Sequence, residues 1–141
     1  MIERNASIEA PPERVWSLLA DLHTWPVWDP DFVEVLQVDR GLVEGGGMIM
    51  ELEEERKSKI RFSRVKSNES FVWQARMIFG LIRTTSRFKL EPLNEGGATR
   101  LTYSFKMHGL LGGMVSFLNP GAMIAGTEIG LENIKKLAEK N

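Results

Sequence analysis

Polar and apolar residues alternate along most of the chain between positions 32 and 107, which predicts a series of β-strands. Five segments show one apolar face and one polar or charged face: 48–53, 59–63, 71–77, 82–91 and 100–107. Residues 3–9 and 32–39 alternate less strictly and are expected to add two strands. Because one face of each later strand is polar, the pattern indicates an antiparallel sheet with one solvated side.

Helical spacing replaces the alternation near both ends of the chain. Pro11 and Pro12 precede a short amphipathic segment, so we expect a helix over residues 12–20 and a second short turn over 23–28. Asn119 and Pro120 are typical of a helix start, and about 20 residues of amphipathic pattern follow them. This last helix has only one large apolar surface to bury against, which is the sheet.

Cross-strand charges suggest a register for two of the expected hairpins. If Phe88 faces Tyr103, Glu91 lies opposite Arg100. If Met50 faces Phe62, the glutamates at 51 and 53 lie opposite Arg61 and Lys59. Opposite charges facing each other across strands contribute only about 0.2–1 kcal/mol per pair, so they adjust the register more than the stability.

Two sequence motifs resemble a known family. The N-terminal motif comprises Ile8-Glu9-Ala10-Pro11, Val15-Trp16, Leu19, Asp21, Trp25-Pro26 and Trp28. The last helix contains Leu131-Glu132-Asn133-Ile134-Lys135-Lys136-Leu137. Together with the order of elements, these motifs resemble the polyketide cyclase/dehydrase and lipid-transport family of the START-like superfamily. The resemblance implies an α+β helix-grip fold over residues 1–141 as a single domain. In that fold a seven-stranded curved antiparallel sheet surrounds a long C-terminal helix, with two short helices between strands 1 and 2.

A curved sheet around one helix is expected to leave an apolar cavity on its concave side. An empty void of ~400 Å³ would cost on the order of 10 kcal/mol, so we expect the cavity to be small, filled with water, or occupied. The inward positions are mostly large and flexible or aromatic, and a packed core is the competing interpretation. The expected ligand-binding residues are Met48, Met50, Phe62, Phe71, Trp73, Met77, Thr84, Ser86, Phe88, Tyr103, Phe105, Met107, Met123 and Thr127.

A few polar side chains on the inward positions are candidates for orienting a ligand. The hydroxyl of Tyr103, the only tyrosine, would need a partner if it is buried. Arg64 has inward parity at the end of its strand, where it either leans to solvent or binds an anionic group. We expect no carboxylate or histidine clearly inside the cavity. His23 is expected in a surface turn, while His108 either is structural or lines the cavity mouth.

Composition excludes several kinds of site. The 141 residues carry a formal net charge of -1, which gives no electrostatic case for nucleic acid. There is no cysteine, and the histidines have no metal-ligand spacing, so neither a metal site nor a cofactor is expected. No serine sits in a nucleophile elbow, and the catalytic residues, if there are any, stay unknown. With neither a signal peptide nor a membrane span expected, the predicted location is cytoplasmic.

One apolar, glycine-containing stretch, residues 110–118, precedes the last helix. It is expected to close one end of the barrel as core, to act as a lid that opens to admit a ligand, or to make transient contact with a membrane to collect lipid. Three functions stay open. The first is the binding or transport of a small hydrophobic molecule such as a lipid, isoprenoid or polyketide. The others are a polyketide cyclase or aromatase-like lyase, and a co-chaperone-like protein-interaction domain. The oligomeric state is not indicated.

Overall fold

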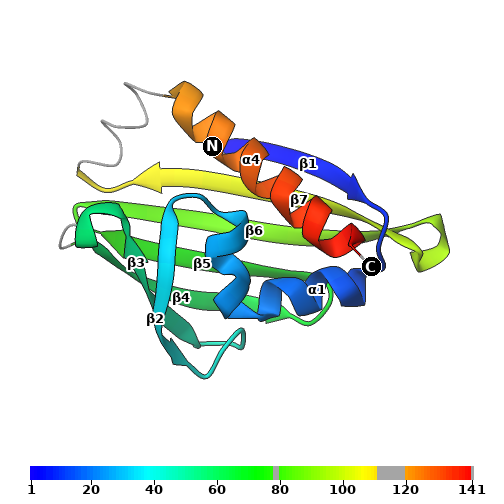
Figure 1. Cartoon of the computed structure of the whole chain (residues 1–141), viewed down its shortest axis with the longest axis horizontal. Helices are drawn as coiled ribbons and strands as arrows, with labels where there is room; N and C mark the ends of the chain where they lie inside the picture. Colours follow the sequence, from blue (N-terminus) through cyan, green and yellow to red (C-terminus); the bar gives the residue numbers. More distant parts are fainter. Residues whose placement is uncertain (78–79, 111–119, 141) are drawn as a thin grey trace.

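The computed structural model describes residues 1–77, 80–110 and 120–140 and contains a seven-stranded antiparallel sheet. The strands lie in the order β1-β7-β6-β5-β4-β3-β2, so the first and last strands of the chain are neighbours (Figure 1). Their bounds are β1 Ile2–Ile8, β2 Phe32–Asp39, β3 Gly47–Leu52, β4 Lys57–Lys66, β5 Ser70–Met77, β6 Ile82–Leu93 and β7 Ala98–His108. The α+β helix-grip architecture expected from the sequence is confirmed.

Two short helices and one long helix cover the same side of this sheet (Figure 1). Helix α1 (Pro12–Ala20), the 3-10 turn η1 (Leu22–Thr24) and α2 (Trp25–Trp28) lie between β1 and β2. Helix α4 spans Pro120–Glu139, as the cap residues predicted. Two further 3-10 turns, η2 (Glu53–Glu55) and η3 (Asn94–Gly96), form the β3–β4 and β6–β7 connections.

Helix α4 packs against β1, α1 and α2 more than across the middle of the sheet. Three hydrogen bonds between a side chain and a backbone carbonyl attach the second half of α4 to these elements. Lys135 Nζ donates to the Ser7 carbonyl at 2.7 Å, and Arg14 Nε donates to the Ala138 carbonyl at 2.6 Å. Asn133 Nδ2 donates to the Trp28 carbonyl at 3.1 Å. The C-terminal half of α4 is thereby attached to the N-terminal elements.

An aromatic cluster fills the concave side where α1 and α2 meet the sheet. Trp25 is fully buried, and its indole N–H donates to the Leu19 carbonyl at 2.8 Å. Its ring centroid lies 5.0 Å from that of Trp73 and 5.8 Å from that of Phe62. Buried aromatic pairs at such separations add to the stability from their buried area. This end of the concave side is therefore solid.

One of the two proposed registers is confirmed and the other is wrong. Phe88 pairs with Tyr103, and Glu91 pairs with Arg100. In the β3–β4 hairpin, however, Met50 lies opposite Ser58 instead of Phe62. The residues of η2 close a tight turn directly after Leu52, with left-handed backbone at Glu54 and Glu55. The turn geometry therefore determines the register, since the proposed charge pairs are worth too little to oppose it.

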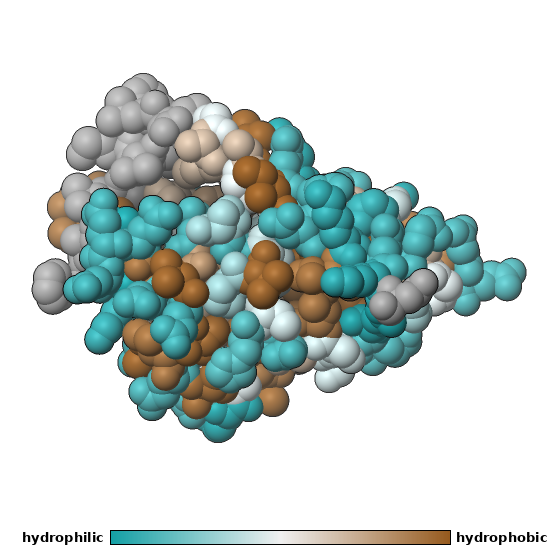
Figure 2. Space-filling model, viewed as in Figure 1, coloured by the Kyte–Doolittle hydropathy of each residue, from teal (hydrophilic) through white to brown (hydrophobic). Residues whose placement is uncertain are grey.

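Strand β2 lies at the edge of the sheet opposite to β1, and it exposes apolar side chains. Val33, Leu36 and Val38 are between 39% and 52% exposed. Figure 2 shows brown apolar side chains at the surface around β2, on a face that is otherwise mostly teal. None of the helices in the described ranges has the length and apolar character needed to cross a bilayer.

Candidate ligand-binding cavity

A cavity of about 370 Å³ lies between the sheet and the first half of α4. It occupies the end of the concave side where β5 and β7 end and β6 begins, at Met77, Met107 and Ile82. Residues after α2 and around η2 form its other walls. The cavity is partly open to solvent and lies beyond the solid aromatic cluster.

Apolar side chains form about half of the wall, and polar side chains are distributed among them. The apolar lining consists of Phe32, Leu52, Trp73, Ala75, Met77, Ile82, Phe105, Met107, Ala122 and Met123. The polar lining consists of Asp29, Asp31, Glu53, Arg56, Ser58, Thr84, Tyr103 and Thr127, and Gly126 completes the wall on α4. The wall is therefore more polar than the predominantly apolar walls that are usual in small-molecule sites.

The structure divides the fourteen residues expected to bind ligand into two groups. Eight of them line the cavity: Trp73, Met77, Thr84, Tyr103, Phe105, Met107, Met123 and Thr127. The other six lie in the buried core outside the cavity wall: Met48, Met50, Phe62, Phe71, Ser86 and Phe88. The aromatic side chains of α2 occupy the concave side next to several of these six. Ligand contact by the eight lining residues stays a prediction.

The Asp29 carboxyl is the main feature that sequence analysis missed, because no carboxylate was expected in the cavity. Asp29 follows the last residue of α2, and the Asp31 backbone N–H donates to its Oδ1 at 3.0 Å. Burial is the main cause that raises the pKa of Asp29 from 3.8 to about 7. The hydrogen bond from the Asp31 backbone lowers this pKa, and the negative charge of the Asp31 side chain raises it slightly. The Asp29 carboxyl therefore changes its protonation near neutral pH.

Tyr103 presents a protonated hydroxyl to the same cavity. Its ring is buried 4.4 Å from that of Phe88, measured between centroids. Burial raises the pKa of Tyr103 well above 10, and the Asp29 charge adds to this. Tyr103 is thus a hydrogen-bond donor at every physiological pH.

Two other buried polar atoms in the wall have no hydrogen-bond partner among the described residues. They are Trp73 Nε1 and Ser58 Oγ, on side chains only 2% and 1% exposed. Buried polar groups normally find a partner, and an indole N–H can only donate. In contrast, the Thr127 hydroxyl already donates to the Met123 carbonyl at 2.9 Å. The wall therefore contains two residues, Trp73 and Ser58, whose polar atoms are enclosed without a partner in the described ranges.

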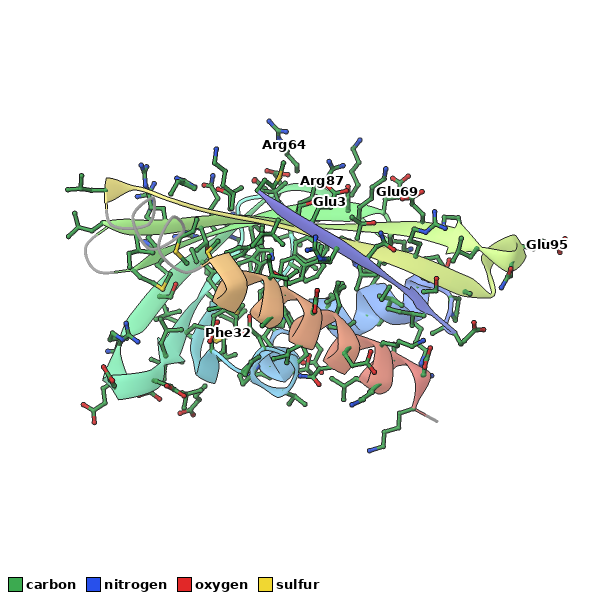
Figure 3. The ribbon with its side chains drawn as sticks, turned by 90° about the horizontal axis from the view of Figure 1, so that it is seen from above. Glu3, Phe32, Arg64, Glu69, Arg87 and Glu95 are labelled. Carbon is green, nitrogen blue, oxygen red and sulfur yellow. The ribbon has the colours of Figure 1, made fainter. Side chains whose placement is uncertain are left out.

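The remaining sequence candidates lie outside the cavity wall. The β4–β5 register shifts between Ser63 and Lys66, and Arg64 has left-handed backbone at this irregularity. Arg64 is exposed and projects from the side of the sheet that faces away from α4 (Figure 3). The expectation that it leans to solvent is confirmed, and the alternative of an inward anion site is wrong. His108 Nε2 lies within hydrogen-bond distance of Thr85 Oγ1, at 2.9 Å. His108 does not line the cavity.

Two further expectations concern the segment before α4 and metal binding. In the 110–118 segment, Leu110 is 78% exposed, while the rest lies outside the described residues. Within the described ranges, no three His, Cys, Asp or Glu side chains gather as metal ligands would.

Comparison with known proteins supports this picture of the fold. Residues 1–139 match the sequence model of a family described as "Polyketide cyclase / dehydrase and lipid transport". No curated protein matches the chain.

Among solved structures, hypothetical protein jhp0584 from Helicobacter pylori gives a TM-score of 0.78 at 10% identity, over 96% of this chain and 86% of that one. Protein CV1439 from Chromobacterium violaceum gives a TM-score of 0.72 at 23% identity, over 99% of this chain and 98% of that one. The di-domain ARO/CYC protein StfQ from the steffimycin biosynthetic pathway gives 0.73 at 14% identity, over 99% of this chain but only 44% of StfQ. At these identities the likeness concerns the fold alone.

Proposed function

Because the chain belongs to the polyketide cyclase / dehydrase and lipid transport family, we propose that it binds or carries a small hydrophobic molecule with a polar group. The observation behind this proposal is the composition of the cavity wall. Apolar side chains make up about half of it, while Trp73 Nε1 and Ser58 Oγ have no partner within the described residues. A wholly apolar ligand would leave these two atoms unpaired.

The size of the cavity agrees with this class of ligand. Small-molecule sites usually measure about 300–1,000 Å³, and this cavity measures about 370 Å³. Because this space is partly open, water fills it when no ligand is bound, and a ligand that binds only the folded chain stabilises it by mass action. Binding of a fitting ligand is therefore expected to raise the melting temperature.

The polar groups define how a ligand would be oriented. Tyr103 and Trp73 both donate hydrogen bonds, so a carbonyl, ether or hydroxyl oxygen of the ligand is expected between them and the open side. The Asp29 carboxyl accepts a hydrogen bond when ionised and donates one when protonated. The methionines at 77, 107 and 123 adapt to the shape of the apolar part.

A second candidate function is acid–base catalysis on a ketone. Asp29, with its pKa of about 7, shares the cavity with the protonated Tyr103. In this reading the Asp29 carboxylate removes a proton from the carbon next to a carbonyl group, and the Tyr103 hydroxyl stabilises the enolate oxygen. Such a step would serve the ring closures of polyketide cyclases, which the description of the family names.

Two glycines of α4 allow a matched test of ligand binding. A Cβ built on either Gly126 or Gly121 meets no atom within 4 Å, but only Gly126 lines the cavity. Gly126→Leu should therefore fill part of the cavity, while Gly121→Leu should not. Gly126 lies in the helix interior, where replacing glycine favours the helix by up to about 1 kcal/mol, while Gly121 lies in the first turn of α4, where the gain is smaller.

The experiment measures displacement of an environment-sensitive fatty-acid probe by apolar compounds with and without a polar head. We expect saturable probe binding to the wild type and to Gly121→Leu, and at least tenfold weaker binding to Gly126→Leu. Absence of saturable binding, or equal affinity in all three proteins, would contradict a ligand site in this cavity. Turnover of a polyketone that is lost in Asp29→Asn but retained in Gly121→Leu would favour the enzyme instead.

A further inference from the structure

Four positively charged side chains form a band on the convex face of the sheet. Lys59 pairs with Arg76, and Arg76 pairs with Arg83, across three adjacent strands. On β7, the residue directly opposite Arg83 is His108, and Lys106 lies two positions away from His108, diagonally beside Arg83. All four cationic side chains are exposed. We call Lys59, Arg76, Arg83 and Lys106 the basic band.

The basic band is not neutralised within the described part of the chain. Among residues 1–77, 80–110 and 120–140, no carboxylate lies within ion-pair distance of the band, whereas Arg61 and Lys89 on the same face pair with Asp39 and Glu91. Acidic residues flank the band on both sides: Glu51 and the η2 glutamates lie on its β3 side, and Glu3 of β1, which pairs with Ser104, lies diagonally beside Lys106. Like charges placed directly opposite each other across strands destabilise a sheet, so the fold alone does not explain this arrangement.

A surface hollow of about 610 Å³ adjoins the band near the ends of β3, β4 and β5. Its lining combines four cations with apolar side chains and Ser58: Arg56, Lys57, Lys59 and Arg76 with Ile49, Leu52, Met77 and Gly80. It shares Leu52, Arg56, Ser58 and Met77 with the ligand cavity. Cations beside apolar walls suit a molecule with an anionic head and a hydrocarbon part.

Exposed leucines lie at the same end of the sheet as the band. Leu81 directly precedes β6 and is 37% exposed, and Leu110 follows β7 and is 78% exposed. A Cβ on Gly109 would lie 2.7 Å from the Leu81 carbonyl oxygen, which shows that these two strand ends are in contact. Both nucleic acid and an anionic bilayer carry phosphate groups that attract these cations, but of the two a bilayer also accepts the leucine side chains.

We propose that the basic band, the adjoining hollow and Leu81 form a docking surface for an anionic lipid bilayer. The charges and the leucine contact the headgroup region, and the hollow receives a lipid headgroup. The cavity opens at the same end of the sheet, so docking would bring its mouth close to the lipids. This inference rests on the surface residues and stands or falls separately from the cavity ligand.

The test is co-sedimentation of the full chain with vesicles of phosphatidylcholine alone and of phosphatidylcholine mixed equally with phosphatidylglycerol. We expect binding only to the anionic vesicles, and weakening as salt is raised. Arg76→Gln combined with Arg83→Gln should weaken it roughly 30-fold, because each cation near the surface contributes about 1 kcal/mol and 1.4 kcal/mol is tenfold. Lys136→Gln combined with Lys140→Gln removes the same charge from exposed positions at the C-terminal end of the chain and should change the affinity less than twofold.

Three results would overturn the proposal. The first is equal binding to both kinds of vesicle by the wild type, which needs no variant to fold. The second is an equal effect of the two double substitutions, which would make the effect one of net charge. The third is tighter binding to a random-sequence DNA duplex than to anionic vesicles at physiological salt, which would assign the band to nucleic acid. Leu81→Ser separates bilayer contact from pure charge, since it should weaken vesicle binding several-fold, and an unchanged affinity would contradict bilayer contact.

Discussion

The side-chain amide of Asn133 on α4 donates a hydrogen bond to the carbonyl of Trp28 at the end of α2. The bond spans 3.1 Å and connects residues 105 positions apart in the sequence. The next residue after Trp28 is Asp29, whose carboxyl lines the cavity. One partly buried contact therefore fixes the element that carries the carboxyl to the helix that forms the opposite wall.

Removing this contact should destabilise the protein. Asn133→Ala leaves the Trp28 carbonyl without this partner, which we expect to lower the free energy of unfolding by about 1 kcal/mol. The gain in helix propensity from alanine offsets part of the loss. Urea denaturation measures the change, and Glu132→Ala, at an exposed neighbouring position, should stay within about 0.5 kcal/mol of the wild type. Equal stabilities of the two variants would show that the bond contributes nothing.

Asp29 should make the stability depend on pH. Its pKa is about 7 in the folded protein and 3.8 ordinarily, so folding takes up a proton between these values. The stabilising effect of protonation is complete below about pH 4 and is lost as the pH rises through about 7. Asp29→Asn should abolish this decline. The full rise in the pKa of Asp29 corresponds to a loss of about 4 kcal/mol in the free energy of unfolding between about pH 4 and about pH 8. Because solvent reaches part of the carboxyl, we expect a loss of about half that size.

This dependence is tested by measuring the free energy of unfolding of the wild type and of Asp29→Asn in urea, at evenly spaced pH values from about 4.5 to about 8. The asparagine amide oxygen still accepts the Asp31 backbone hydrogen bond, so the loop should keep its shape. If the difference in free energy between the two proteins stayed constant across this range, Asp29 would have an ordinary pKa.

Tyr103 should discriminate between ligands by their polar group. Tyr103→Phe retains the ring packed on Phe88 but removes the hydroxyl that faces the cavity. We expect about tenfold weaker binding of ligands with a carbonyl or hydroxyl group, and unchanged binding of hydrocarbons of similar size. Titration calorimetry with matched pairs of ligands measures this. If both kinds of ligand lost affinity equally, the hydroxyl would have no orienting role.

Phe71 and Met77 should respond differently to truncation, although both have inward positions on β5. Phe71 is fully buried between Trp16 and Phe88, and Phe71→Ala should cost about 3–5 kcal/mol. Met77 lines the partly open cavity, so Met77→Ala should cost less than about 1.5 kcal/mol and should mainly change ligand affinity. Thermal unfolding compares them. A similar loss for both would mean that the space near Met77 is packed like a core.

Most of the fold could be predicted from the sequence because side-chain parity along a strand determines which face is buried. The 12–20 helix and the 32–39 strand have the predicted bounds, and the start of α4 follows from Pro120. The β3–β4 register could not be predicted, since it depends on a left-handed turn at Glu54 and Glu55 that no glycine signals.

The candidate site was less predictable than the fold. Parity identifies the concave side, but it does not show which part of that side the aromatic residues of α2 fill. Phe62 and Trp73 pair with each other and share a parity, yet only Trp73 reaches the cavity. Asp29 was missed because it lies in the short link after α2, where no periodicity indicates direction. The motif Trp28-Asp29-Pro30 was the available signal, a carboxylate held between a helix end and a proline.

The pairing of β1 with β7 has a consequence for synthesis on the ribosome. Ile8 pairs with Thr99 and Ile2 with Phe105, so the first strand emerges long before its only neighbour in the sheet is translated. Until then its backbone groups have no sheet partner, and the apolar side chains that it buries are exposed to chaperones and to other nascent chains. Such distant contacts slow folding. The closing of this sheet is therefore expected to wait until β7 has left the exit tunnel.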